Sequence, residues 1–196
     1  MEIILAAIIG AVATLSAAIV SVYFKARINL KCKNKLLTNH VDQNANVYTA
    51  LDSIMSEINC DRVHVFEFHN GDSYYSGSSQ QKFSSTYEVV RQGISSECIK
   101  LQNLRVSNFN VLVKDVVKED MFICDDVDKI DSCTEKDHLI SQGVKSVYSF
   151  PIKTLTGQPI GILSVDFVAN KNKITPEVIN FLKNQSSIIS GYICSS

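Results

Sequence analysis

Side chains able to do chemistry are concentrated in residues 68–77, which read FHNGDSYYSG. This stretch places an imidazole, an amide, a carboxylate and two phenols where a strand-like run passes into a Ser-rich loop. Groups of these types donate and accept hydrogen bonds, so they suit contact with a small polar molecule. The alternative is a hairpin corner at Asn70-Gly71 in which His69 and Asn70 satisfy the loop backbone.

The sequence gives little support to catalysis. It contains no G-x-S-x-G elbow, no P-loop, no G-x-G-x-x-G and no H-E-x-x-H. His64 lies five residues before His69 on an alternating run, and we predict that it faces solvent. We therefore predict that the chain is not an enzyme, with a degenerate enzyme as the weakest alternative.

No metal site is predicted either. Asp125, Asp126, Asp128 and Asp131 form an acidic cluster, but the glycine and the closing glutamate of a calcium loop are missing. The six cysteines form no Cys-x-x-Cys pair and have no histidine at zinc-site spacing. Their even number would allow disulfides in an oxidising space, whereas in the cytoplasm they would be reduced.

The elements that position these groups follow from periodicity. Apolar residues at helical spacing predict a helix over residues 36–58, which a break at 59–61 ends. Alternation predicts a strand at residues 62–68, and strand-forming residue types predict further strands at 83–90, 121–127, 146–153 and 159–168. Residues 74–81 are a loop by composition, a Thr-Gly-Gln turn joins the last two strands, and residues 100–117 stay unassigned. Thr175-Pro176-Glu177 has the residue types that begin a helix.

The C-terminal half resembles GAF domains. The resemblance rests on Gly143-Val144-Lys145-Ser146, Phe150-Pro151-Ile152, the run from Gly157 to Val165 that contains Ile160-Gly161-Ile162-Leu163-Ser164, and the final helix after Ile174. Upstream, residues 123–127 look like the family's i-x-D-V segment and residues 62–68 look like its first sheet strand. The match covers residues 41–194 and consists of core and turn positions, so it is more specific for fold than for function.

The resemblance implies an α+β fold, with about six antiparallel strands flanked by helices and a ligand pocket on one side. In that arrangement the loop at residues 68–77 would border the pocket. The candidate ligand-binding residues are then His69, Asn70, Tyr74, Tyr75, Ser84 and Thr86. The cofactor stays unknown: Ile174 and Val178-Ile179 replace the residues of cyclic-nucleotide binders, and no Cys-His pair suits a bilin.

The N-terminus predicts a membrane anchor. Residues 3–24 contain no charge, and at 1.5 Å per residue they extend about 33 Å, enough for a hydrocarbon core of about 30 Å. A buried core helix is the alternative, and a signal peptide would carry its basic residues before the apolar run. Small residues at four-residue spacing suggest self-association. We predict a transmembrane helix at 1–24, a basic juxtamembrane segment at 25–40 and a GAF-like domain at 41–196.

Charge supports this division. Five basic residues and one acidic residue give residues 1–36 a charge of +4, and the remaining 14 basic and 19 acidic residues give −5. The basic segment favours contact with membrane lipid and a cytoplasmic domain on a single-pass chain. An acidic domain does not suit nucleic acid.

Together these patterns predict a membrane-anchored, homo-oligomeric sensory module of GAF type. It would regulate a partner by binding a small molecule or by dimerisation. The alternative is a phage holin-like protein, in which the single span oligomerises and the soluble domain regulates it.

Overall fold

The computed structural model describes residues 38 and 40–194. A compact unit begins at Gln43 and is built on one six-stranded sheet with the strand order β3-β2-β1-β6-β5-β4. Every pair of neighbouring strands is antiparallel. The strands are β1 (Arg62–Ser73), β2 (Ser79–Val90), β3 (Leu104–Arg105), β4 (Phe122–Cys124), β5 (Ser146–Lys153) and β6 (Pro159–Phe167).

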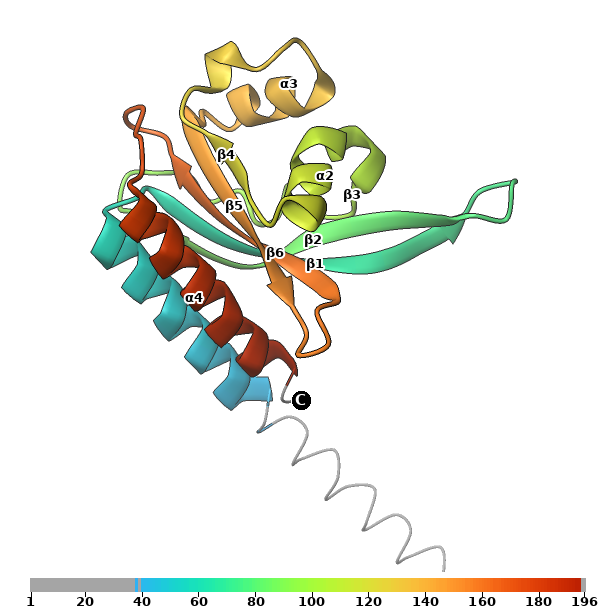
Figure 1. Ribbon diagram of the computed structural model, residues 1–196, viewed down its shortest axis with the longest axis horizontal. Helices are drawn as coiled ribbons and strands as arrows, with labels where there is room; N and C mark the ends of the chain where they lie inside the picture. Colours follow the sequence, from blue (N-terminus) through green and yellow to red (C-terminus); the bar gives the residue numbers. More distant parts are fainter. Residues whose placement is uncertain (1–37, 39, 195–196) are drawn as a thin grey trace, which may run out of the picture. The chain divides into compact units, whose positions relative to one another are not determined.

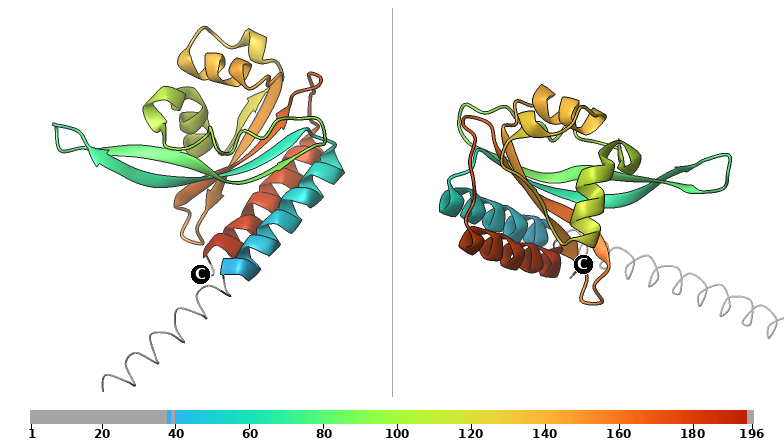
Figure 2. Two further views of the ribbon diagram at one scale, coloured as in Figure 1. Left: turned by 180° about the vertical axis from the view of Figure 1, so that it is seen from behind. Right: turned by 45° about the horizontal axis from the view of Figure 1, so that its top comes forward.

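Helices cover both faces of the sheet. The first helix spans residues 40–58, and its part from Gln43 onward lies beside α4 (Pro176–Cys194) on one face, whereas α2 (Asn110–Lys118) and α3 (Thr134–Ser141) lie on the other (Figures 1 and 2). Two 3₁₀ turns, Val106–Phe109 and Val127–Lys129, lead into α2 and toward α3. This arrangement confirms the predicted α+β fold.

The face under the helix pair holds a continuous apolar core. Leu51 and Ile54 from the first helix and Leu182 and Ile189 from α4 are fully buried against the sheet. Their helical spacing gives each helix one apolar stripe, and burial of that stripe fixes the helix on the sheet. The predicted start of α4 is confirmed, because the N–H of Ile179 donates to the carbonyl of Thr175.

The opposite face carries a second core and is the one that bears polar groups. In β1, Val63 and Val65 belong to the core under the helix pair, while His64 and Phe66 point to the α2/α3 side. This is the period-2 alternation of a strand. A shift in the β1–β2 register between Val65 and Phe66 marks a bulge.

The predicted turn at Asn70-Gly71 is wrong. β1 continues through both residues to Ser73, and the turn lies at residues 74–78, where Gly77 has φ +79°. Position 71 is crowded within the ribbon: a Cβ there would lie 2.6 Å from Cε of the flexible Lys82 side chain and 3.0 Å from the carbonyl oxygen of Gln80 on β2. The predicted loop at 74–81 accordingly shrinks to the tip, and β2 begins at Ser79.

The unassigned residues 100–117 form a bent segment, β3, a 3₁₀ turn and most of α2. Within the described ranges, no helix has the length and apolar character that crossing a membrane requires. The predicted span at 1–24 lies outside those ranges, as does the predicted basic segment at 25–40 except for residues 38 and 40.

Candidate ligand pocket

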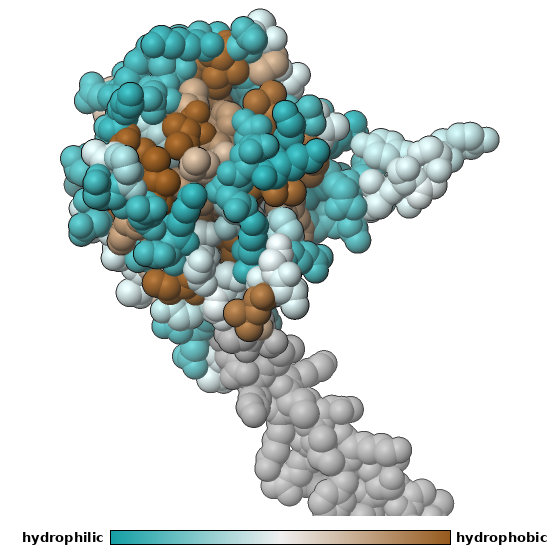
Figure 3. Space-filling view, in the orientation of Figure 1, coloured by the Kyte–Doolittle hydropathy of each residue, from teal (hydrophilic) through white to brown (hydrophobic). Residues whose placement is uncertain are grey.

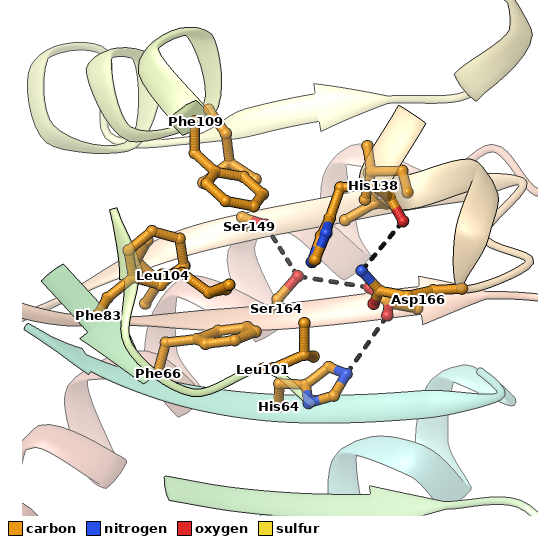
Figure 4. A pocket seen from close by; sticks show the side chains of 15 residues that line it. His64, Phe66, Phe83, Leu101, Leu104, Phe109, His138, Ser149, Ser164 and Asp166 are labelled. Atoms are coloured by element: carbon orange, nitrogen blue, oxygen red, sulfur yellow. Dashed lines mark hydrogen bonds and ion pairs between the residues drawn. The ribbon is translucent and has the colours of Figure 1, made fainter. Parts of the chain in front are cut away.

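A cavity lies between the sheet and the helices α2 and α3 (Figure 4). Strands β1, β2, β5 and β6 supply its floor, and residues from the 3₁₀ turn, α2 and α3 supply its roof. Water-sized spheres can occupy about 40 Å³ of it. A single water needs about 10–15 Å³ by that measure, so the cavity has room for a few waters or a small ligand fragment.

Aromatic rings form one end of the cavity. Phe83 packs edge-to-face against Phe66 at a centroid distance of 5.5 Å and against Phe109 at 5.2 Å. Edge-to-face packing holds the rings in fixed orientations. Leu104 lies beside Phe83 at the same end, so this part of the cavity suits an apolar group, and Leu101 lines the cavity next to His64.

A chain of polar side chains forms the other end. Ser149 and Ser164 lie 2.9 Å apart through their hydroxyl oxygens, and the Ser164 hydroxyl donates to Oδ1 of Asp166 at 3.5 Å. Oδ2 of Asp166 lies 3.4 Å from Nε2 of His64, whose Nδ1 is 3.3 Å from the hydroxyl of Ser85. All five residues are buried, so the chain is a polar floor within an otherwise apolar face.

Buried charges continue from this floor. Arg62 is completely buried, and its Nη1 lies 3.3 Å from Oδ2 of Asp166. Its Nε is 3.8 Å from Oε1 of Glu88, and its Nη2 donates to the carbonyl of Ser95 at 3.2 Å. His64 lies between the same two carboxylates. Buried charges of this kind are costly unless paired, so the cluster depends on all its members.

The charged cluster also binds the segment after β2, which forms part of the cavity wall. Glu88 accepts hydrogen bonds from the N–H groups of Glu97 at 2.8 Å and Cys98 at 3.2 Å. Three residues further along, the carbonyl of Leu101 accepts from the N–H of Ser85 at 2.8 Å. The carboxylate and the strand thereby position Leu101 in the cavity wall.

The roof contributes His138, whose ring stands edge-to-face on Phe109 at 5.0 Å. Its Nε2 is buried and has no hydrogen-bond partner in the described part of the chain. Burial lowers the pKa of this imidazole, and the charge of Glu97 opposes that effect only in part. A neutral imidazole with an unsatisfied nitrogen can donate or accept one hydrogen bond, depending on its tautomer. His138 can therefore bind a polar atom of a ligand.

The six residues predicted from sequence lie elsewhere, and none of them lines this cavity. Two come together: Nε2 of His69 lies 2.8 Å from the hydroxyl of Ser84, which also accepts from the N–H of Asn103. Asn70 accepts from the amide of Gln81 at 3.2 Å, and the hydroxyl of Thr86 donates to the carbonyl of Val65.

The tyrosines lie at the hairpin tip, where Tyr74 is 43% and Tyr75 110% exposed. No contact joins them to the cavity, so the ligand role of all six residues stays a prediction.

The sequence prediction for His64 is wrong, since the ring is 1% exposed. Alternation separates the two faces of a strand but does not say which is covered, and the α2/α3 layer covers the face that bears His64. A sequence signal did exist: Ser164 and Asp166 recur at period 2 within the apolar strand β6. Polar residues so placed on a central strand indicate a polar site beneath a cover.

The other polar clusters have structural partners. Lys171 lies 2.6 Å from Asp126 and 2.8 Å from Asp128. No group of three or more metal-ligating side chains occurs among the described residues. The five described cysteines are free, and burial raises the pKa of Cys60 to about 12, which makes its thiol unreactive.

Comparisons with known proteins identify the fold. No family model and no curated protein matches the sequence. Among solved structures, the PixJ GAF domain of Thermosynechococcus elongatus matches with a TM-score of 0.63 and 18% identity, covering 79% of this chain and 86% of that one. A phycocyanobilin-bound GAF domain from a cyanobacterial phytochrome gives 0.60 and 16%, over 79% and 85%. The GAF domain region of a Geobacter sulfurreducens protein gives 0.60 and 13%, over 81% and 97%.

These likenesses extend over most of each chain, and they agree with the strand order and the helix layers described above. Identities below a fifth establish the architecture alone. The chain therefore has a GAF-like fold.

Proposed function

We propose that this chain is a sensory module that binds a small molecule in the cavity under α2 and α3 and passes the binding to a partner protein. One observation carries the proposal: the buried, unpartnered Nε2 of His138 in the roof of a cavity with a polar floor. An unsatisfied buried nitrogen costs free energy, which a ligand atom would recover. The neighbours include light-sensing and bilin-binding GAF domains, which supports a sensory role.

The ligand that fits is small and amphipathic. Its apolar part would pack among Phe66, Phe83 and Phe109, and one polar atom would reach His138. The room of about 40 Å³ favours a small group over a tetrapyrrole in this conformation. Binding would be transmitted to the partner protein through the segment that follows β2. This segment contains Leu101, which lines the cavity, and it is hydrogen-bonded to the buried carboxylate of Glu88.

The experiment compares two histidines. Full-length protein is screened by native mass spectrometry and by thermal shift against small amphipathic molecules, and any hit is retested on His138→Leu and His69→Leu. We expect at least a tenfold loss of affinity for His138→Leu and less than a twofold change for His69→Leu. The reverse pattern would place the ligand at the hairpin residues instead, and the absence of any ligand across the screen would count against a binding role.

We further propose that residues 1–24 anchor this module in a membrane, with the domain in the cytoplasm. The uncharged run at residues 3–24 and the basic residues after it support this topology. The structure supplies a suitable reporter, because Cys194 is exposed whereas Cys60 and Cys124 are buried. In intact cells a membrane-impermeant thiol reagent should leave Cys194 unlabelled. Labelling that disappears in Cys194→Ser would reverse the proposed orientation.

A further inference from the structure

The outer part of the β1–β2 hairpin projects from the body of the domain (Figures 1 and 2). β6 pairs with β1 only from Arg62 to Glu67, and β3 pairs with β2 only at Lys82 and Phe83. Residues 69–82, which we term the arm, form a ribbon of two strands that extends outward from Lys82, the outermost β2 residue paired with β3. Along residues 69–81 both outer edges lack a further strand in the described part of the chain.

The residues of the arm do not form an apolar face that would stabilise a ribbon of this length. It contains no aliphatic residue, and its tip is pale in Figure 3, near the middle of the hydropathy scale. A two-stranded ribbon without an apolar face is only marginally stable in water. The tip is nevertheless closed by backbone hydrogen bonds, from the N–H of Tyr74 to Ser78 at 2.8 Å and from that of Gly77 to Tyr74 at 2.9 Å.

The edges carry few protective features, namely one register irregularity between Asn70 and Ser73 and one lysine, Lys82. Natural edge strands usually carry lysines, prolines or inward charges that block further pairing. The arm has no proline, and its only formal charges are Asp72 and Lys82. Open backbone groups on such an edge are suited to pairing with another strand.

The charge distribution of the chain indicates which strand would pair with the arm. Residues 37–196 carry −5, so the bodies of two copies repel each other, whereas the arm has a formal charge of zero and projects outward. In a two-fold contact each arm would offer one carboxylate and one ammonium, with amides and hydroxyls that both donate and accept. Nucleic acid would require a basic surface, and a lipid surface would require apolar or basic residues.

We propose that the arm pairs edge to edge with the arm of a second copy of this chain, which converts two ribbons into one four-stranded sheet. The contact does not involve the ligand cavity. Two ribbons of this size bury less surface than the 1,200–2,000 Å² of a standard interface. The pairing is therefore weak and depends on concentration.

The test is photo-crosslinking of the full-length protein. p-Benzoylphenylalanine replaces Tyr75 at the arm tip or, as a matched control, Leu155, which is 108% exposed in the β5–β6 turn. We expect covalent dimers from position 75 that increase with concentration and exceed those from position 155 at least tenfold. Mass spectrometry should locate the acceptor within residues 69–82. Equal yields, no dimer, or an acceptor elsewhere on the chain, on lipid or on nucleic acid would overturn the proposal.

A second experiment exchanges the charges of the arm. Asp72→Lys gives the arm a charge of +2 and Lys82→Glu gives it −2, so each variant alone should lose at least four-fifths of its crosslinked dimer. An equal mixture of the two should recover it as heterodimer. Undiminished crosslinking of either variant alone, or no recovery in the mixture, would refute arm pairing. Ligand binding at His138 should be unchanged in every one of these variants, so the two proposals fail separately.

Discussion

Removal of one carboxylate beneath the cavity tests whether the buried charge cluster supports the site. Asp166→Asn keeps the shape of the side chain but removes its charge. Arg62, which is fully buried, then keeps only Glu88 at 3.8 Å and the carbonyl of Ser95 at 3.2 Å. Loss of one partner from a buried ion pair costs about 3–5 kcal/mol. Because the amide retains part of the hydrogen bonding, we expect the free energy of unfolding to fall by about 3 kcal/mol.

The assay is urea unfolding followed by circular dichroism, with Asp120→Asn as the matched control. Asp120 pairs with Lys153 at the surface, so its loss should cost less than about 1 kcal/mol. A thermal scan should show the midpoint of Asp166→Asn lowered by about 6–12 °C, from 2–4 °C per kcal/mol for a chain of this size.

A double-mutant cycle decides the physical cause. If Arg62 and Asp166 interact directly, Arg62→Met combined with Asp166→Asn should cost about 1–3 kcal/mol less than the two single losses together. Losses that add to within about 0.5 kcal/mol, or a loss for Asp166→Asn no larger than that of Asp120→Asn, would refute the coupling.

Three further expectations concern the cavity, the backbone and pH. Phe109→Ala should cost about 3–5 kcal/mol by urea unfolding, and benzene should then raise the melting temperature of the variant but not that of the parent. Gly161→Ala should leave little folded protein by circular dichroism, because its Cβ would collide with the carbonyl oxygen of Phe66. Gly191→Ala, by contrast, has open space in α4 and should raise the free energy of unfolding by about 0.5–1 kcal/mol. Burial lowers the pKa of His138 in the folded protein below its usual value of 6.5. As the pH falls below about 6.5, the unfolded chain therefore binds a proton at this residue more readily than the folded protein does, and the contribution of His138 to stability decreases. The advantage of the parent over His138→Gln in urea should therefore shrink from pH 8 to pH 5, and a constant difference would show that the imidazole is not desolvated.

The structure suggests a different role for the exposed Tyr74 and Tyr75. From sequence they were candidates for a pocket-bordering loop, and in space they stand at the end of a ribbon whose edges are open. The histidine comparison and the crosslinking experiment address these two roles independently. Because His69 is itself an arm residue, a ligand held there would occupy the base of the arm, whereas arm pairing would leave the cavity at His138 free to bind.

The sequence alone determined most of the elements around the site. The strand-like runs at residues 146–153 and 159–168 flank a Gly-containing turn, and Gly157 there has φ +83°, so local chemistry was sufficient to predict β5 and β6, the second of which ends one residue earlier at Phe167. The start of α4 at Pro176 likewise follows from residue types that act within one helical turn.

Tertiary structure decided what the polar residues do. Whether His64 faces water or a cavity depends on α2 and α3, which arrive from 46 or more residues further along the chain. The end of β1 at Ser73 depends on pairing with the neighbouring strand β2, which continues past Asn70-Gly71 to Ser79. Periodicity reports which side chains share a face, but only packing against distant residues determines whether that face is covered. For this reason the sequence indicated the fold, and the structure located the pocket and the arm.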